Sequence, residues 1–263
     1  MDKIREKGIC ISQECLSPGI FSMWIETQIA QSAIPGQFVS VYTKNESKLL
    51  PRPISICEAD AAAGKIRLVY RIAGDGTKEF SGYVPGDEVD ILGPLGNGYD
   101  LNIKEVDKKE GGKALLIGGG IGIPPMLELA KRLPCEVTIV AGYRSRDNMF
   151  LVKELESNGE LIIASDDGSV GTHGTVIDAV CEHGVKADVI FACGPKPMLK
   201  GVKNLGEKMG VPAYISMEER MACGVGACLG CVCKTGSVDE HSKVNNKRVC
   251  VDGPVFLATE VEL

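Results

Sequence analysis

The stretch "LLIGGGIGIPPM", residues 115–126, runs from an apolar segment through four glycines to two prolines. The apolar segment is typical of a buried strand, and proline is favoured in the first turn of a helix. Further along, Met126, Leu129 and Ala130 follow the spacing of an apolar helix face. Pro134 ends this pattern. We therefore expect a strand, a glycine loop and a helix, in this order.

The same alternation continues along the chain. Apolar runs occur at "ALLIG" (114–118), "EVTIV" (136–140), "LIIAS" (161–165), "DVIFA" (188–192) and "AYISM" (213–217), with helical patterns between them. Such alternation predicts a parallel sheet with helices on both faces. Residues 114–217 are therefore predicted to form an α/β domain that binds a nucleotide.

The glycine loop allows two interpretations. Small residues before a helix let a phosphate approach exposed amides. The spacing of Gly118, Gly120 and Gly122 differs from the G-x-G-x-x-G fingerprint. A simple tight turn explains these glycines equally well. Two more loops, "SDDGSVGTHG" and "CGPKPM", also follow predicted strands and would lie at the same sheet edge. Together the loops favour a nucleotide pocket, with candidate residues Gly118, Gly119, Gly120, Gly122, Asp166, Asp167, Gly168, Cys193, Gly194 and Pro195.

Cys193 is the candidate in this pocket to face a bound nicotinamide, because it ends a predicted strand at the sheet edge. A small thiol packed at a strand end is the alternative interpretation.

The first part of the chain, residues 1–101, has a different pattern. Short segments with strand character occur at 21–29, 36–42, 54–60, 65–72 and 86–96, broken by turns. Strands of this length with little helix between them predict an antiparallel barrel or sandwich. The charged segment 102–113 lacks periodicity and is the expected linker.

Two motifs in this first domain carry arginines and glycines suited to phosphate. "LLPRPISI" displays Arg52 between stiff prolines, and a guanidinium suits a pyrophosphate. "VYRIAGDGTKEF" ends a strand at Arg71 and opens a short helix near Gly76. Each alone fits a hairpin with surface arginines, but together they suggest a dinucleotide lying across the barrel.

The C-terminal segment 218–263 contains a cysteine motif. Cys223, Cys228 and Cys231 follow C-x4-C-x2-C, and Cys250 lies further along. This spacing is typical of a plant-type [2Fe–2S] cluster, whereas a structural zinc site more often shows two C-x2-C pairs. Cys233 is predicted to be a bystander. The segment is short for a core of its own, so we expect an inorganic group to hold it together.

Composition excludes some classes of function. The chain has 263 residues, a formal net charge of −6 and no basic block, which argues against nucleic-acid binding. No apolar run reaches the ~20 residues of a membrane span, and the N-terminus is charged. Eleven cysteines favour metal-binding, catalytic or buried thiols in a reducing compartment, so we expect a cytoplasmic protein.

Taken together and in order, these motifs resemble the electron-transfer subunits of type B dihydroorotate dehydrogenases, in the ferredoxin reductase superfamily. The resemblance covers essentially the whole chain. It rests on "PGQFV", "RPISI", "YRIAGDGT", "GPLGNGY", "GGGIGIPPM", "SDDGSVGTHG", "CGPKPM", "ERMACGVGACLGC" and "CVDGPVF".

The resemblance implies a flavin barrel, a pyridine-nucleotide domain and a [2Fe–2S] segment. It implies FAD contacts from Arg52, Pro53, Ile54, Ser55, Val69, Tyr70, Arg71, Gly76 and Thr77, and cluster ligands Cys223, Cys228, Cys231 and Cys250. It also implies a separate FMN-containing subunit that oxidises dihydroorotate to orotate, in a two-plus-two heterotetramer. Electrons would pass from that FMN through the cluster and FAD to NAD+, in pyrimidine biosynthesis.

Some alternatives stay open. Arg144 and Arg146 follow the second strand of the α/β domain and could bind a 2′-phosphate, which would favour NADP over NAD. A related flavoprotein subunit of a ferredoxin:NADP oxidoreductase or sulfide dehydrogenase is the nearest other function. A non-catalytic interaction module stabilised by zinc is a third.

Overall fold

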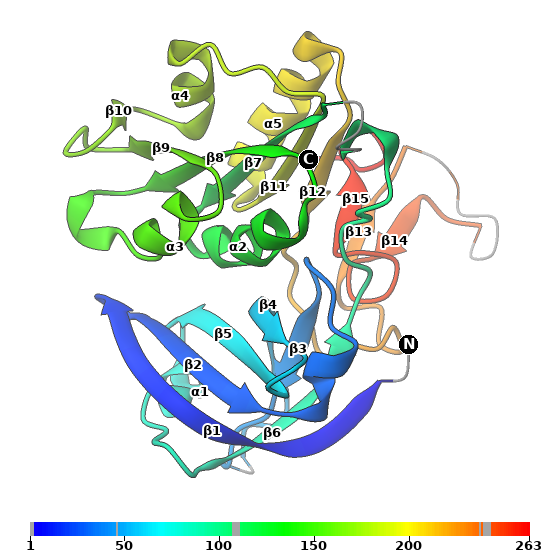
Figure 1. Ribbon diagram of the computed structural model, residues 1–263. Coiled ribbons are helices and arrows are strands. Elements are labelled where there is room, and N and C mark those ends of the chain that lie inside the picture. The colour runs from blue at the N-terminus through cyan, green and yellow to red at the C-terminus, as the bar shows by residue number, and fades with distance from the viewer. Residues whose placement is uncertain (1–2, 46, 107–110, 237, 239–242) are drawn as a thin grey trace.

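Figure 1 shows two lobes stacked on each other, with a smaller C-terminal segment beside them. The computed structural model describes residues 3–45, 47–106, 111–236, 238 and 243–263. The lower lobe is a closed barrel of antiparallel strands, and the upper lobe is a mostly parallel seven-stranded sheet. The predicted barrel and α/β domain are confirmed.

The barrel has the strand order β1-β2-β5-β4-β3-β6. Side chains alternate along each strand: in β5, Leu68 and Tyr70 are buried in the barrel core, whereas Val69 packs toward the upper lobe. The bounds are β1 (Ile4–Ser17), β2 (Ile20–Glu26), β3 (Phe38–Val41), β4 (Arg52–Asp60), β5 (Lys65–Arg71) and β6 (Glu88–Leu95), and helix α1 (Asp75–Phe80) follows β5.

The first strand begins at Ile4, earlier than the sequence pattern predicts. Two of its exposed side chains are charged and pair with β6: Arg5 lies 2.9 Å from Asp90, and Lys7 lies 2.7 Å from Glu88. The apolar alternation that normally reveals a strand is weak here, because Gly8 is buried while Ile9 and Ile11 are exposed.

The upper sheet has the strand order β10-β9-β8-β7-β11-β12-β15, in which β15 runs antiparallel to β12. The chain order reverses at β7, whose neighbours are β8 and β11. In open α/β sheets this reversal creates a crevice at the carboxyl ends, where ligands bind. The bounds are β7 (Lys113–Gly119), β8 (Glu136–Tyr143), β9 (Glu160–Ser165), β10 (Thr172–His173), β11 (Val189–Cys193), β12 (Ala213–Ser216) and β15 (Val255–Leu257).

Helices cover both faces of this sheet. On one face α2 (Ile123–Arg132) and α3 (Val152–Glu156) bury Met126 and Leu155, and α2 lies between the sheet and the barrel. On the other face α4 (Val176–Glu182) and α5 (Lys196–Met209) bury Ala179 and Val202. Short 3-10 turns occupy Gln28–Gln31, Lys104–Val106, Gly120–Gly122 and Arg146–Asn148. Within the described ranges, no helix is both long and apolar enough to cross a membrane.

The C-terminal segment is tied into the upper lobe. Strand β13 (Val232–Lys234) pairs with β14 (Asn246–Arg248), and β15 extends the large sheet. Cys231, Val249 and Phe256 are buried in the same core as α4 and α5. Its short length suggested that an inorganic group alone would hold the segment together. The structure shows that packing against the upper lobe also holds it.

Candidate functional site

A cavity of about 440 Å³ lies where the barrel, the parallel sheet and the C-terminal segment meet. It brings side chains predicted to contact FAD next to the cysteine predicted to face a nicotinamide. The barrel contributes Phe38, Pro53 and Ser55, the sheet edge contributes Cys193, Ser216 and Met217, and the C-terminal segment contributes Glu218, Glu219, Arg220, Met221 and Pro254.

Cys193 ends β11 at this cavity and is only 2% exposed. Burial raises the pKa of its thiol to about 12, although a hydrogen bond with Ser216 opposes the shift. The thiol is therefore neutral at physiological pH, and a neutral thiol is a poor nucleophile. Cys193 is therefore a neutral thiol packed in the cavity wall, and that it faces a nicotinamide stays a prediction.

Glu218 lines the same cavity, and no sequence motif singled it out. Partial desolvation by the cavity walls raises the pKa of its carboxyl, while the positive charge of Arg71 opposes the shift. The sequence offered one signal, an acidic residue directly after the predicted strand 213–217.

Two predicted flavin contacts from different elements touch each other on the barrel. The guanidinium of Arg52 lies directly against Gly76 of α1, in the space that a Cβ atom there would occupy. The hydroxyl of Thr77 accepts hydrogen bonds from the amides of Ala73 (2.8 Å) and Gly74 (3.2 Å), which fixes the turn into α1. The two sequence motifs therefore meet on one surface, where the guanidinium of Arg52 suits a pyrophosphate.

Tyr70 faces away from this surface. Its side chain is 1% exposed in the barrel core, with its hydroxyl 2.8 Å from Nε2 of Gln13. Because strand side chains alternate, Val69 and Arg71 face outward instead. Tyr70 can therefore offer only its main chain to a ligand outside the barrel.

The glycine loop after β7 packs against the loop after β11. A Cβ atom on Gly122 would lie 2.2 Å from the carbonyl oxygen of Cys193, and one on Gly119 would lie 2.6 Å from Sδ of Met198. Gly120, by contrast, has φ +53° and open space around the Cβ position. Both interpretations of the loop therefore have support: close packing explains Gly122, and the space beside Gly120 can admit a ligand.

The loop after β9 lies on the same edge but farther away. β8 separates β9 from β7, which places the two strands roughly 10 Å apart. Asp166 and Asp167 are exposed there, and the guanidinium of Arg146 donates a 2.8 Å hydrogen bond to the carbonyl oxygen of Ser169. The structure thus places all three predicted loops on one edge, while direct contact joins those after β7 and β11.

The four predicted cluster cysteines form two pairs. The thiol of Cys223 interacts with that of Cys228. The thiol of Cys231 interacts with that of Cys250, whose backbone amide donates a 3.4 Å hydrogen bond to the sulfur of Cys231. No three His, Cys, Asp or Glu side chains of the described residues lie close enough together to hold a single metal ion. Two thiol pairs fit a two-iron cluster, in which the protein would supply two cysteine thiolates to each iron, better than one tetrahedral zinc ion.

Backbone amides surround the sulfur of Cys223. Val225 and Ala227 donate to it at 3.4 Å and 3.3 Å. Partial burial opposes ionisation, yet these hydrogen bonds lower the pKa of the thiol to about 6. The amides can turn inward because Gly224 and Gly226 have φ values of +68° and +85°. The loop therefore stabilises a thiolate, which is the form that binds iron.

The cysteine loop lies against the barrel. A Cβ atom on Gly224 would lie 2.8 Å from Oγ of Ser40 in β3. Cys233 sits instead on β13, 6% exposed in the core with Val249. Its assignment as a bystander stays a prediction.

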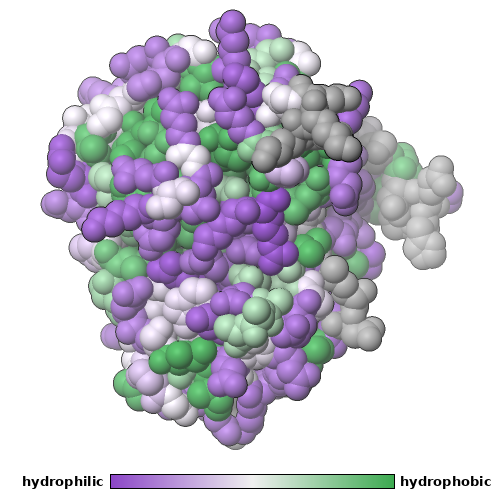
Figure 2. Space-filling view, viewed as in Figure 1, coloured by the Kyte–Doolittle hydropathy of each residue, from purple (hydrophilic) through white to green (hydrophobic). Residues whose placement is uncertain are grey.

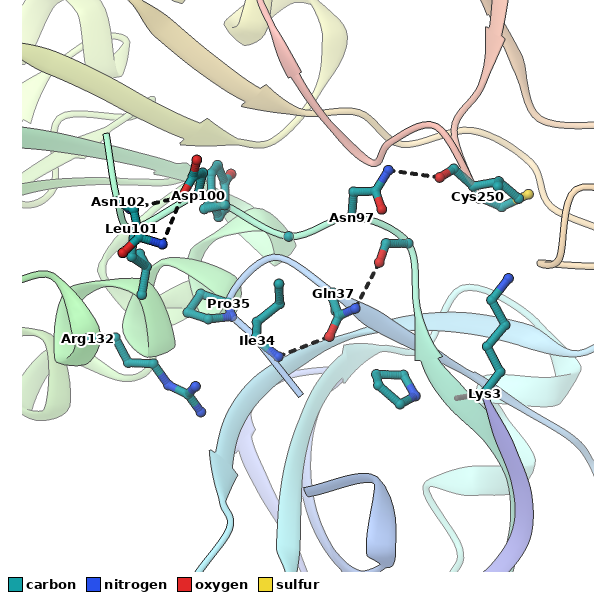
Figure 3. Close-up of a pocket in the computed structure, with 15 residues that line it drawn as sticks. Lys3, Ile34, Pro35, Gln37, Asn97, Asp100, Leu101, Asn102, Arg132 and Cys250 are labelled. Carbon is teal, nitrogen blue, oxygen red and sulfur yellow. Dashed lines mark hydrogen bonds between the residues drawn. The ribbon is translucent and has the colours of Figure 1, made fainter. Parts of the chain in front are cut away.

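A separate cavity of about 560 Å³ flanks the other half of the cysteine site (Figure 3). Asn97 donates a 2.9 Å hydrogen bond to the carbonyl oxygen of Val251, next to Cys250. Gln37 donates to the carbonyl oxygen of Gly96 at 2.8 Å and so holds the same loop. These bonds fix the segment that carries Cys250 to the end of the barrel.

Comparison with known proteins decides the family. Residues 11–99 match the oxidoreductase FAD-binding domain, and residues 218–262 match the iron-sulfur cluster binding domain of dihydroorotate dehydrogenase B. A protein from Geobacillus thermodenitrificans named dihydroorotate dehydrogenase B (NAD(+)), electron transfer subunit, is 43% identical, over 98% of this chain and 99% of that protein. This chain belongs to the same family. A subunit of that name from Listeria innocua is 44% identical, over 96% of this chain and 97% of that protein.

Solved structures agree with this assignment. The electron-transfer subunit shares its fold with an NADH-dependent reduced ferredoxin-NADP oxidoreductase, at 29% identity and a TM-score of 0.84, covering 97% of this chain and 89% of that chain. A ferredoxin-NADP+ reductase from Plasmodium falciparum shares the fold at 16% identity and a TM-score of 0.63, covering 78% of this chain and 93% of that chain. The comparisons confirm an oxidoreductase subunit with an FAD-binding and an iron–sulfur domain.

Proposed function

We propose that this subunit passes electrons between NAD+ and a separate FMN-containing catalytic subunit that oxidises dihydroorotate to orotate, in pyrimidine biosynthesis. The shared cavity is the observation that carries the proposal. Ser55 from the barrel, Cys193 from the sheet edge and Met221, two residues before the first cluster cysteine, line one space. Sites for two redox cofactors and a nucleotide are therefore neighbours.

The proposed FAD contacts are the barrel residues predicted from the sequence. When bound, FAD exchanges electron pairs with a nicotinamide, and a [2Fe–2S] cluster exchanges single electrons. The charges of Arg52 and Arg71 neutralise a pyrophosphate. The full set is Arg52, Pro53, Ile54, Ser55, Val69, Tyr70, Arg71, Gly76 and Thr77, with Tyr70 acting through its main chain.

The cysteine pairs Cys223–Cys228 and Cys231–Cys250 are the proposed cluster ligands. Their loop prepares ionised sulfur at Cys223 and packs against β3, so the barrel and the cluster site keep a fixed separation. The domain boundaries 1–101, 114–217 and 218–263, with a linker at 102–113, remain part of the proposal, and residues 107–110 of that linker lie outside the described residues.

The proposed nucleotide site is the crevice between β7 and β11, extended toward the loop after β9. Gly118, Gly119, Gly120, Gly122, Cys193, Gly194 and Pro195 form its centre, and Asp166, Asp167 and Gly168 lie at its far end. The relatives' name states NAD(+), and we extend this preference to the chain.

The proposed assembly contains two copies of this subunit and two of the catalytic subunit, in the cytoplasm. The relatives' name, electron transfer subunit, requires a partner of some kind. None of the eleven cysteines forms a disulfide, which supports a reducing compartment.

A related flavoprotein subunit of a ferredoxin:NADP oxidoreductase is the second candidate. The fold match with a TM-score of 0.84 favours it, but the identity there is 29%, against 43% for the dihydroorotate dehydrogenase B subunit.

The deciding experiment is co-expression with a candidate FMN subunit, followed by an assay of dihydroorotate-dependent reduction of NAD+ and NADP+. We expect NAD+ reduction by a complex that contains FAD, iron and acid-labile sulfide. A cofactor-replete complex that reduces neither nucleotide contradicts the proposal. Electron exchange with ferredoxin under the same conditions then supports the second candidate.

A further inference from the structure

Charged side chains are buried at the junction between the two lobes. Glu58 of β4, Arg67 of β5 and Glu128 of α2 are 9%, 6% and 4% exposed. Lys131 and Arg132, in the last turn of α2, join them. We call these five side chains the ionic clamp. Figure 2 shows a band of hydrophilic residues on the surface of this junction, and beneath them Cys57 and Val69 of the barrel share an apolar core with Met126 of α2.

Within the barrel, the guanidinium of Arg67 organises the clamp. It donates hydrogen bonds of 2.8 Å to Oε1 of Glu58 and 2.8 Å to Oγ of Ser22. Glu154 of α3 lies 3.6 Å from the same guanidinium. Glu58 is thereby held in one orientation, with its second oxygen directed at α2.

Two contacts cross from the barrel to α2. Nζ of Lys131 donates to Oε2 of Glu58. The amide of Ala59 donates a 3.2 Å hydrogen bond to Oε2 of Glu128, which also pairs with Arg132. The end of β4 and the end of α2 are therefore joined by partly buried, directional bonds.

The opposite ends of these two elements carry the proposed cofactor sites. β4 begins with the proposed flavin contacts Arg52–Ser55, and α2 begins directly after the glycine loop. Both elements are rigid, and the ten residues of α2 span about 15 Å. A small rotation at Lys131 would therefore displace the glycine loop relative to the flavin contacts.

We propose that the ionic clamp sets the position of the nucleotide relative to the flavin, and that Lys131 and Glu128 are positioning residues for the transfer between them. This inference rests on the proposed function. In that transfer a hydride with its two electrons leaves NADH, giving NAD+ and two-electron-reduced FAD. Buried ion pairs rarely stabilise a fold more than apolar packing does, but their directional bonds define one geometry. A displacement of ~1 Å at reacting atoms costs up to about 100-fold in rate.

Lys131→Met tests the clamp in the FAD-loaded subunit. The variant removes the contact between Lys131 and Glu58, one of those that join the lobes, and leaves the buried Glu58–Arg67 pair in place. We expect the limiting rate of flavin reduction by NADH in stopped flow to fall about tenfold, with the nucleotide dissociation constant within about twofold of wild type. Hydrogen exchange of peptides from β4 and α2, without nucleotide, should accelerate about fivefold. Lys131→Arg should restore both values.

Lys7→Met is the matched control, because it removes an exposed ion pair within the barrel. It should leave rate and exchange unchanged. If Lys131→Met keeps the wild-type rate of flavin reduction and the wild-type hydrogen exchange, the proposed role of the clamp is wrong. It is also wrong if Lys131→Met and Lys7→Met lose the same amount of rate. If NADH does not reduce the flavin of the wild-type subunit, the proposed function is wrong instead. The hydrogen exchange of β4 and α2 in the variants then still tests whether the clamp fixes the two elements.

Discussion

A Cβ atom on Gly122 would lie 2.2 Å from the carbonyl oxygen of Cys193, so the loops after β7 and β11 meet in direct contact. Gly122→Ala should force these loops apart, because the clash is with backbone and no side chain can move away. We expect a loss of about 1–3 kcal/mol in the free energy of unfolding. We also expect weaker nicotinamide-nucleotide binding in a fluorescence titration.

Gly82→Ala provides the comparison for this change. A Cβ atom there would meet its nearest neighbour, the carbonyl oxygen of Glu79, at an ordinary 3.4 Å. Equal stability losses in the two variants would show that the contact with Cys193 has no special importance.

The paired thiols predict different results for two neighbouring cysteines. Cys228→Ser should abolish bound iron and acid-labile sulfide, because Cys228 is paired with Cys223 in the loop. Cys233→Ser should keep both, because Cys233 is buried in the core on β13. Iron analysis and the visible absorption spectrum measure the outcome. A cluster that needs Cys233 but survives loss of Cys231 contradicts the assigned ligands.

The raised pKa of Glu218 predicts a pH-dependent stability difference. A carboxyl whose pKa is higher in the folded state binds its proton more tightly there, so its contribution to stability is present below the ordinary value of 4.5 and is lost as pH rises through the folded value. Glu218→Gln cannot ionise. Its melting temperature relative to wild type should therefore increase from pH 4 to pH 8. A difference that stays constant over this range argues against desolvation of the carboxyl.

Tyr99 links the end of the barrel to the upper sheet. Its hydroxyl donates a 3.0 Å hydrogen bond to the carbonyl oxygen of Ala192, in β11, and its side chain is 2% exposed. Tyr99→Phe should cost about 1 kcal/mol in urea unfolding, because a buried carbonyl loses a donor. Tyr42→Phe, on a half-buried ring, should cost less. Equal costs would mean that the bond to Ala192 contributes nothing measurable.

The architecture could be predicted because its signals are local. Alternation along "KIRLVYRI" and the switch to apolar runs separated by helices after Lys113 each follow from side-chain periodicity. The cysteine motif is local as well. Its C-x4-C-x2-C spacing indicated a cluster, and the small residues between the cysteines suit a tight loop around iron and sulfide.

Other features depend on contacts between distant segments. Glu218 joins the cavity, and Glu58 meets Lys131, only because the barrel and α2 fold against each other. A buried charge in a strand has no periodic signal of its own. The inward direction of Tyr70, by contrast, follows from alternation, because Ile66, Leu68 and Tyr70 share one face of β5. The family motif includes Tyr70 without indicating which of its atoms can reach a ligand.

Strand β15 has a consequence for how the subunit meets its partner. The chain leaves the sheet after β12, forms the cysteine loop and returns to pair with the same strand, Ile215 opposite Phe256. The loop is thus anchored at both ends and cannot swing out on a tether as a mobile carrier would. An electron donor or acceptor must therefore approach the fixed cysteine loop. The rate of electron exchange then depends on how closely the partner docks against this loop.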